Sequence, residues 1–208
     1  MRCLLHPVYF PNIITMALLA QQQCVWEVMD YFEKQTFRNR TYISTDQGKQ
    51  MLSIPISHVG GKKGKQYYRE VETDNTYPWQ RQHWRSLQTA YRSSPFFEYY
   101  EDDLAPLFQK AAASLLDHNI HCMEIVCSLL NLTLPTQKTT LYNPSPKEVR
   151  DMRFLVDAKR PAPIKMPVYT QVFTERNGFI ENLSILDLLF NEGPNTLNYL
   201  QELNLTDA

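Results

Sequence analysis

The stretch RCLLHPVYFPNIITMALLAQQQCVWEV, residues 2–28, decides the fold class. Residues 2–5 form a short apolar run that indicates a strand. Residues 12–20 then carry apolar side chains at helical spacing, and Asn12 is of the residue type that caps a helix N-terminus. Residues 24–28 indicate a second buried strand. Strand, helix and strand over this length predict a βαβ unit, so we expect an α/β protein with an N-terminal, Rossmann-like sheet.

The loop after the first strand is the first candidate site. Pro7 and Pro11 restrict the backbone there and bracket a turn, which we expect to be exposed, with Tyr9 and Phe10 in it. In open α/β sheets ligands bind at the carboxyl ends of the strands. His6, at that end, is therefore a candidate acid, base or hydrogen-bond donor. The alternative is that His6 caps the sheet while Tyr9 and Phe10 cover the core.

The segment DYFEKQTFRNR, residues 30–40, follows the second strand and should lie beside the first loop. Arginine forks bind phosphate or carboxylate, lysine adds a mobile positive charge, and amides fix orientation. The alternative is a solvated strand entry with ordinary ion pairs. The candidates in this segment are Asp30 as a catalytic residue and Lys34, Gln35, Arg38, Asn39 and Arg40 as substrate-binding residues.

Two further features could contribute to a site. Trp79 and His83 share a helix face at i, i+4, which favours Trp79 in binding and His83 in catalysis, although most aromatic residues here are expected in the core. The glycine-rich loop of residues 60–65 supplies Lys62 and Lys63, and it lacks the glycine-lysine-serine/threonine element of a P-loop. It either closes on an anionic ligand or is a solvated surface loop.

The remaining pattern predicts a single α/β domain over residues 1–208 with a helical C-terminal half. Asp187 lies in an apolar helix, so we expect it to have a basic or hydrogen-bonding partner. The other expected elements, in chain order, are a hairpin of residues 40–44 and 51–57, a strand over 66–72, helices over 79–92, 104–119 and 120–130 (a helical portion of about 79–131), a strand over 139–141, an irregular basic segment over 143–167, and helices over 183–190 and up to Leu200.

Composition excludes several classes of protein. Hydrophobic residues make up 43% and charged residues 21% of the 208 residues, which is typical of a globular chain. The net charge of −1 argues against a partner that is a nucleic-acid polymer. Apolar runs are too short to span a bilayer, and the N-terminus does not resemble a signal peptide, so we expect no membrane insertion and a cytoplasmic location.

We expect neither a metal nor a cofactor. His118, His121 and Cys122 lack the paired spacing of a structural zinc site, and we expect Cys122 to point away from His118. The four cysteines include no CxxC pair and indicate free thiols in a reducing compartment.

Five ordered segments together resemble the WbqC-like family. They are residues 6–11, residues 32–40, Trp79 with His83 and Trp84, residues 91–97, and residues 184–190. The chain departs from the pattern at His6, where many members carry glutamine, and at Asn12, where many carry tryptophan. The resemblance thus favours Tyr9, Lys34, Asn39 and Arg40 as site residues.

The resemblance implies a role in bacterial surface-polysaccharide (O-antigen) biosynthesis but no defined reaction. The hypothesis is a transferase-type enzyme that acts on a nucleotide-sugar or related small anionic metabolite. The competing hypothesis is a non-catalytic binding or scaffold protein of a polysaccharide assembly pathway, which predicts an exposed aromatic patch over residues 96–100. The sequence leaves the oligomeric state open.

Overall fold

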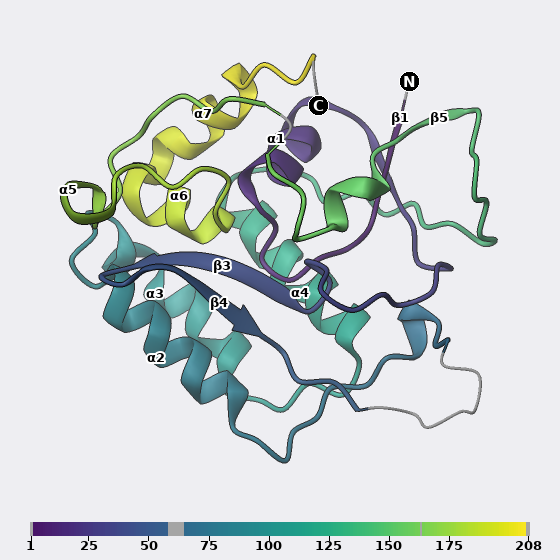
Figure 1. Ribbon diagram of the computed structural model, residues 1–208, viewed down its shortest axis with the longest axis horizontal. Helices are drawn as coiled ribbons and strands as arrows, with labels where there is room; N and C mark the ends of the chain where they lie inside the picture. The colour runs from purple at the N-terminus through teal and green to yellow at the C-terminus, as the bar shows by residue number, and fades with distance from the viewer. Residues whose placement is uncertain (1, 58–64, 163, 207–208) are drawn as a thin grey trace.

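The computed structural model describes residues 2–57, 65–162 and 164–206, and it has mixed α/β architecture (Figure 1). The predicted βαβ unit is present as β1 (Arg2–Leu5), α1 (Ile13–Gln21) and β2 (Cys24–Trp26). β1 and β2 pair in parallel, with Cys3 opposite Cys24. The fold-class prediction is therefore confirmed.

Helix α1 is buried from Ile13 to Leu19, and only its last two residues reach the surface. A helix that is apolar on all sides needs cover on all sides, and α1 packs against α6 (Ile185–Glu192) and α7 (Thr196–Glu202). The side chain of Asn12 accepts a hydrogen bond of 2.9 Å from the backbone N–H of Thr15. Asn12 is therefore the N-cap, as the sequence predicts.

A third strand, β5 (Val149–Asp151), pairs in parallel with the other side of β1. The sheet order is β2-β1-β5, so the first strand in the chain is the central one. The prediction of an irregular segment over residues 143–167 is wrong at these three residues. Two of them are charged, so the strand has no apolar pattern to reveal it.

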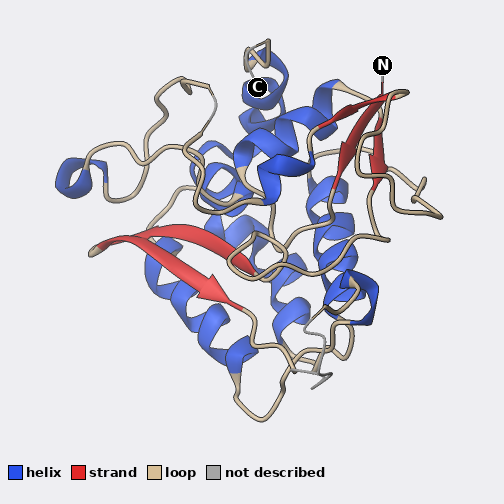
Figure 2. Cartoon of the chain, turned by 45° about the vertical axis from the view of Figure 1, so that its right-hand side comes forward, coloured by secondary structure: helices blue, strands red, loops and turns tan. Residues whose placement is uncertain are grey.

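The predicted hairpin is confirmed as β3 (Arg40–Thr45) and β4 (Gly48–Ser53), which pair antiparallel. It forms its own two-stranded sheet, apart from the parallel sheet (Figure 2). The strand predicted over residues 66–72 is wrong, since this region forms the 3₁₀ helix η1 (Tyr68–Glu70). Lys138 makes an isolated bridge to Trp26, and residues 139–141 form no regular strand.

Helix α2 (Trp79–Tyr91) matches the prediction over residues 79–92. The helices predicted over 104–119 and 120–130 are instead α3 (Phe97–Leu104), η2 (Ala105–Phe108) and α4 (Leu115–Leu129). Pro106 cannot donate a helical hydrogen bond, and Ser114 caps a new helix by accepting from the N–H of Asp117 at 3.1 Å. The other elements are η3 (Arg153–Val156), α5 (Thr174–Asn177) and η4 (Gly193–Asn195).

Asp187 on α6 is fully buried and has the partners that the sequence requires. The hydroxyls of Tyr91 and Tyr169 each donate to its carboxylate at 2.6 Å, and Gln171 Nε2 donates at 3.1 Å. This network joins α2, α6 and the segment between α5 and η3. No helix in the described part of the chain combines the length and the apolar character needed to cross a membrane.

Candidate functional site

The carboxyl ends of the three parallel strands meet at a cavity of about 360 Å³, here called the strand-end cavity. Because β2 and β5 lie on opposite sides of β1, the edge between β1 and β5 is the switch point at which ligands bind in open α/β sheets. The residues that line it are His6, Asp30, Glu33, Arg38, Tyr142, Asp151, Arg153, Phe154, Val156, Asp157 and Arg160.

Three residues predicted from the sequence lie together in this cavity. Arg38 Nη2 is 2.6 Å from His6 Nε2 and donates to Asp30 Oδ2 at 3.1 Å, while His6 Nε2 is 3.0 Å from the same oxygen. Arg38 is buried, its Nη1 donates to the carbonyl of Tyr31 at 3.1 Å, and its plane lies over the ring of Tyr68. The guanidinium therefore joins the loop after β1, which contains His6, to the segment of residues 30–40 after β2.

Burial, and next the charge of Arg38, lower the pKa of His6 to about 4. The ring is therefore uncharged at neutral pH. Arg38 can only donate, so Nε2 is the acceptor at 2.6 Å and the ring proton belongs on Nδ1, which is buried without a hydrogen-bond partner among the described residues. Burial opposes ionisation of Asp30, but the adjacent Arg38 guanidinium, which donates to Oδ2, outweighs it and holds the pKa of Asp30 below its usual value. The geometry makes His6 a positioning group for Arg38 and leaves Asp30 as a carboxylate.

A second charged cluster lies beside these residues, and two of its members, Asp151 and Arg153, line the same cavity. Arg153 binds Asp151 through Nε at 2.8 Å and Nη2 at 2.6 Å, and its Nη1 lies 3.4 Å from Oε2 of the buried Glu27. The sequence reasoning missed all three residues. Glu27 could have been found, because it is a charged residue at the end of a predicted buried strand. Asp151 and Arg153 could not, because nothing local marked β5.

The terminal N–H groups of the two buried arginines contact protein partners, and Arg38 Nε is buried without one among the described residues, whereas carboxylates face the cavity. The side chains of Asp30, Asp151 and Asp157 are 20%, 36% and 41% exposed. Arg160, which is 62% exposed, pairs with Asp157 at only 3.5 Å through Nε and keeps its outer N–H groups accessible. The cavity thus offers acceptors for hydroxyl groups and one accessible cation for an anionic group.

Tyr9, Trp79 and His83 lie together, but in the core. The hydroxyl of Tyr9 is 2.9 Å from His83 Nδ1, and the ring of Trp79 meets the edge of His83 at 5.2 Å. Burial lowers the pKa of His83 to about 4. Tyr9 and Phe10 are buried, so the expectation of an exposed turn is wrong, and the alternative that they cover the core is confirmed. None of these residues lines the strand-end cavity.

Most of the other candidates lie in the segment of residues 30–40, after β2. Lys34 and Gln35 are exposed immediately after Glu33, beside the cavity but outside its lining. Asn39 donates to the carbonyl of Ile54 at 2.9 Å, and Arg40 opens β3. Lys62 and Lys63 lie outside the described residues. The predicted set is therefore divided between the cavity, its surroundings and the core.

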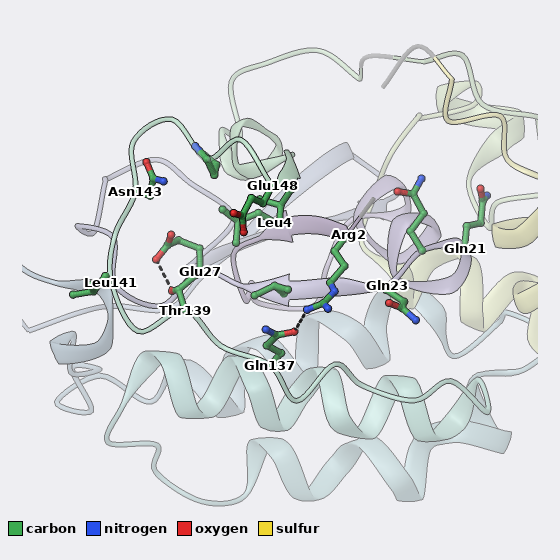
Figure 3. A pocket seen from close by; sticks show the side chains of 14 residues that line it. Arg2, Leu4, Gln21, Gln23, Glu27, Gln137, Thr139, Leu141, Asn143 and Glu148 are labelled. Atoms are coloured by element: carbon green, nitrogen blue, oxygen red, sulfur yellow. Dashed lines mark hydrogen bonds between the residues drawn. The ribbon is translucent and has the colours of Figure 1, made fainter.

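A larger cavity of about 890 Å³, here called the sheet-face cavity, lies over the open face of the parallel sheet (Figure 3). Leu4 and Val25 form its apolar floor, and the loop over residues 137–146 closes it. The sheet-face cavity adjoins the strand-end cavity. Glu27 lines the sheet-face cavity, and Arg153, with which it pairs, lines the strand-end cavity. Figure 3 shows Glu27 accepting from Thr139, at 2.9 Å, along this wall.

Within the described ranges, no group of three or more histidine, cysteine or acidic side chains could hold a metal ion. The expectation that Cys122 points away from His118 is wrong, because its Sγ lies 3.5 Å from His118 Nε2. Residues four apart share a helix face.

Comparison with known proteins identifies relatives of most of the chain. The model of the WbqC-like protein family matches residues 7–160 and 156–199. An uncharacterized protein of Mycobacterium tuberculosis, Rv1507c, is 28% identical over a match that covers 85% of this chain and 86% of that protein. No solved structure matches the chain significantly. The extent of the family match shows that the chain belongs to the WbqC-like protein family.

Proposed function

We propose that this chain is an enzyme of the transferase type that binds an activated sugar, or a related anionic metabolite, in the strand-end cavity. The observation that carries the proposal is the convergence of charged side chains from all three strand ends on one cavity at the switch point of the sheet. Enzymes of open α/β sheets place their reacting groups at this edge.

The charges suit the two ends of an activated sugar. Asp30 and Asp151 accept hydrogen bonds from sugar hydroxyls, and the accessible guanidinium of Arg160 binds the phosphate or carboxylate. Asp30 is ionised and lies at the cavity surface, so it is the group best placed to accept a proton from an attacking hydroxyl. Arg38 holds it in position, and His6 in turn holds Arg38.

Transfer requires a second reactant, and the adjoining sheet-face cavity supplies a place for it. Its walls carry the amides of Gln23, Gln137 and Asn143 and the charged side chains of Arg2, Glu27 and Glu148 over an apolar floor, which suits an acceptor bearing hydroxyl groups. We further propose, on the family resemblance alone, that this reaction belongs to the cytoplasmic steps of surface-polysaccharide biosynthesis.

The alternative function is a non-catalytic binding or scaffold protein of the same pathway. It predicts an exposed aromatic patch over residues 96–100. In that stretch Tyr99 is exposed, but Phe97 and Tyr100 are buried. The stretch therefore provides one exposed ring rather than a patch, which counts against this prediction of the alternative.

The test is a thermal-shift and calorimetric screen with a panel of nucleotide-sugars. We expect binding to the wild type and about tenfold weaker binding to Arg160→Gln, the loss of one charge-assisted contact. Arg92→Gln is the matched control, since Arg92 is 63% exposed and pairs with Glu101 at 3.5 Å, much as Arg160 pairs with Asp157. The proposal would be contradicted if no nucleotide-sugar of the panel bound the wild type, or if Arg160→Gln and Arg92→Gln bound them equally well. Binding without nucleotide release in the presence of acceptor sugars would favour the non-catalytic alternative.

A further inference from the structure

A small apolar cavity of about 250 Å³ adjoins the strand-end cavity. Phe154, Asp157 and Arg160 line both, so the two spaces share a wall. The other residues that line the small cavity are Asn12, Phe37, Leu155, Pro161 and Asn182. A ligand that occupies both spaces must therefore have a charged, hydrophilic part joined to a compact part of low polarity.

Two amides inside the small cavity have a defined orientation. Asn12 Oδ1 accepts from the N–H of Thr15 at 2.9 Å, and Asn182 Oδ1 accepts from the N–H of Ile14 at 3.1 Å. These contacts assign the oxygen of each amide, so the NH₂ groups are the ends left for a ligand. Neither NH₂ group has a hydrogen-bond partner among the described residues.

We propose that this cavity binds the nucleobase of the substrate, and specifically a base with ring carbonyl groups such as uracil. The inference rests on the proposed function. The rings of Phe37 and Phe154 provide apolar faces for a planar base, and the NH₂ groups of Asn12 and Asn182 donate to its carbonyl oxygens. Base and sugar then occupy neighbouring cavities.

Arg160 occupies the position that a diphosphate requires. It belongs to the wall shared by the two cavities, and its guanidinium lies 5.6 Å above the ring of Phe154. A guanidinium there binds phosphates that link a base on one side to a sugar on the other.

A hydrocarbon chain is the main competing occupant of an apolar cavity. It would bury the two NH₂ groups without partners, and each unpaired buried donor costs about 1–3 kcal/mol. A base with carbonyl groups satisfies both donors, so the amides discriminate between the two kinds of ligand.

The test compares uridine 5′-diphosphate, adenosine 5′-diphosphate and glucose 1-phosphate by isothermal titration on the full chain. We expect the uridine nucleotide to bind at least about tenfold more tightly than glucose 1-phosphate, and more tightly than the adenosine nucleotide. The variant Asn182→Asp keeps the acceptor for Ile14 but replaces the donor with an acceptor. It should weaken the uridine nucleotide about tenfold and leave glucose 1-phosphate unchanged.

Asn204→Asp is the matched control, because Asn204 Oδ1 also accepts from a backbone N–H, that of Thr206 at 3.0 Å, and lines neither cavity. Phe154→Leu, which keeps an apolar side chain but removes the ring, should weaken the two nucleotides more than glucose 1-phosphate, since the ring also lies under Arg160 in the strand-end cavity. The base site would be overturned if all three ligands bound equally, or if Asn182→Asp bound the uridine nucleotide as tightly as Asn204→Asp does. The proposed function would remain standing in either case. Failure of all three ligands to bind would count against both.

Discussion

Arg153 reaches past the central strand to Glu27, with its Nη1 3.4 Å from Oε2 of the carboxylate. Glu27 follows β2 and Arg153 follows β5, so the contact joins the two outer strands of the sheet at their carboxyl ends. Oε1 of Glu27 accepts from the N–H of Met29 at 2.8 Å and from Thr139 at 2.9 Å. In the described part of the chain, Arg153 is the cation that balances this buried carboxylate.

Replacing Arg153 should therefore destabilise the protein strongly. In Arg153→Met the carboxylate of Glu27 stays buried without its cation, and breaking a buried pair in this way costs about 3–5 kcal/mol. The free energy of unfolding, measured by urea titration, should fall by that amount. Ligand binding should weaken as well, because Arg153 lines the strand-end cavity and Glu27 lines the sheet-face cavity.

The control is Arg160→Gln, which removes an arginine from an exposed pair. Such pairs contribute about 0–1 kcal/mol, so this variant should unfold near the wild-type urea concentration. If both variants lost the same stability, the Glu27–Arg153 contact would not be the reason.

Acid should unfold the protein through its buried histidines. Burial lowers the pKa of His83 to about 4, with the backbone of Ser53 opposing the shift, and burial likewise lowers that of His118 to about 4. An unfolded histidine titrates near about 6.5. Between these values the unfolded state binds more protons, so the free energy of unfolding falls as the pH falls from about 6.5 towards 4, by up to about 3 kcal/mol for each histidine.

The pH dependence of urea unfolding tests this. His83→Gln should reduce the slope between pH 4.5 and 6.5 by up to about 1.4 kcal/mol per pH unit, the contribution of one proton. His121→Gln is the control, because the His121 side chain is 60% exposed on α4. An unchanged slope in His83→Gln would show that this ring is not neutral in the folded protein.

The local pattern was sufficient for β1, α1, β2 and the hairpin, because each combines an apolar periodicity with a turn or a cap of its own. β5 has three residues, of which Arg150 and Asp151 are charged, and it exists because β1 offers a free edge. β1 lies about 145 residues before β5 in the sequence. A local sequence pattern cannot predict that two segments so far apart will pair.

The same limit applies to the site. Asp30 and Arg38 were predicted because the βαβ topology brings their loop to the sheet edge, and the structure places them there with His6. His83 satisfies a helical spacing that equally fits a core position, and its contact with Tyr9 lies in the core. Spacing along a helix cannot distinguish a site residue from a core residue, since both place the side chain on the buried face of the helix.

Two glycines with positive φ should differ in their tolerance of alanine. A Cβ on Gly193 would lie 2.5 Å from ring atoms of Phe96, whereas a Cβ on Gly48 would meet nothing within 4 Å. Gly48→Ala should cost about 1–2 kcal/mol for the left-handed backbone alone. Gly193→Ala should cost a further 1–3 kcal/mol, roughly, for the forced repacking of the ring. Equal losses in urea unfolding would contradict the steric argument.

His6 should be replaceable by a residue that accepts a hydrogen bond, but not by one that cannot. In the wild type, Arg38 Nη2 donates a hydrogen bond of 2.6 Å to His6 Nε2. In His6→Gln the amide oxygen can accept this hydrogen bond instead. Stability should then change by less than about 1 kcal/mol, and ligand affinity in the nucleotide-sugar screen should be kept.

His6→Leu has a similar size but leaves a buried N–H of Arg38 without its acceptor, which costs about 1–3 kcal/mol. The freed guanidinium is then held by Asp30 and Tyr31 alone, so ligand binding should weaken as well. Urea unfolding and isothermal titration on both variants measure the two effects separately. If His6→Gln lost binding while remaining as stable as the wild type, the imidazole itself would be needed, and His6 would have a chemical role rather than a positioning one.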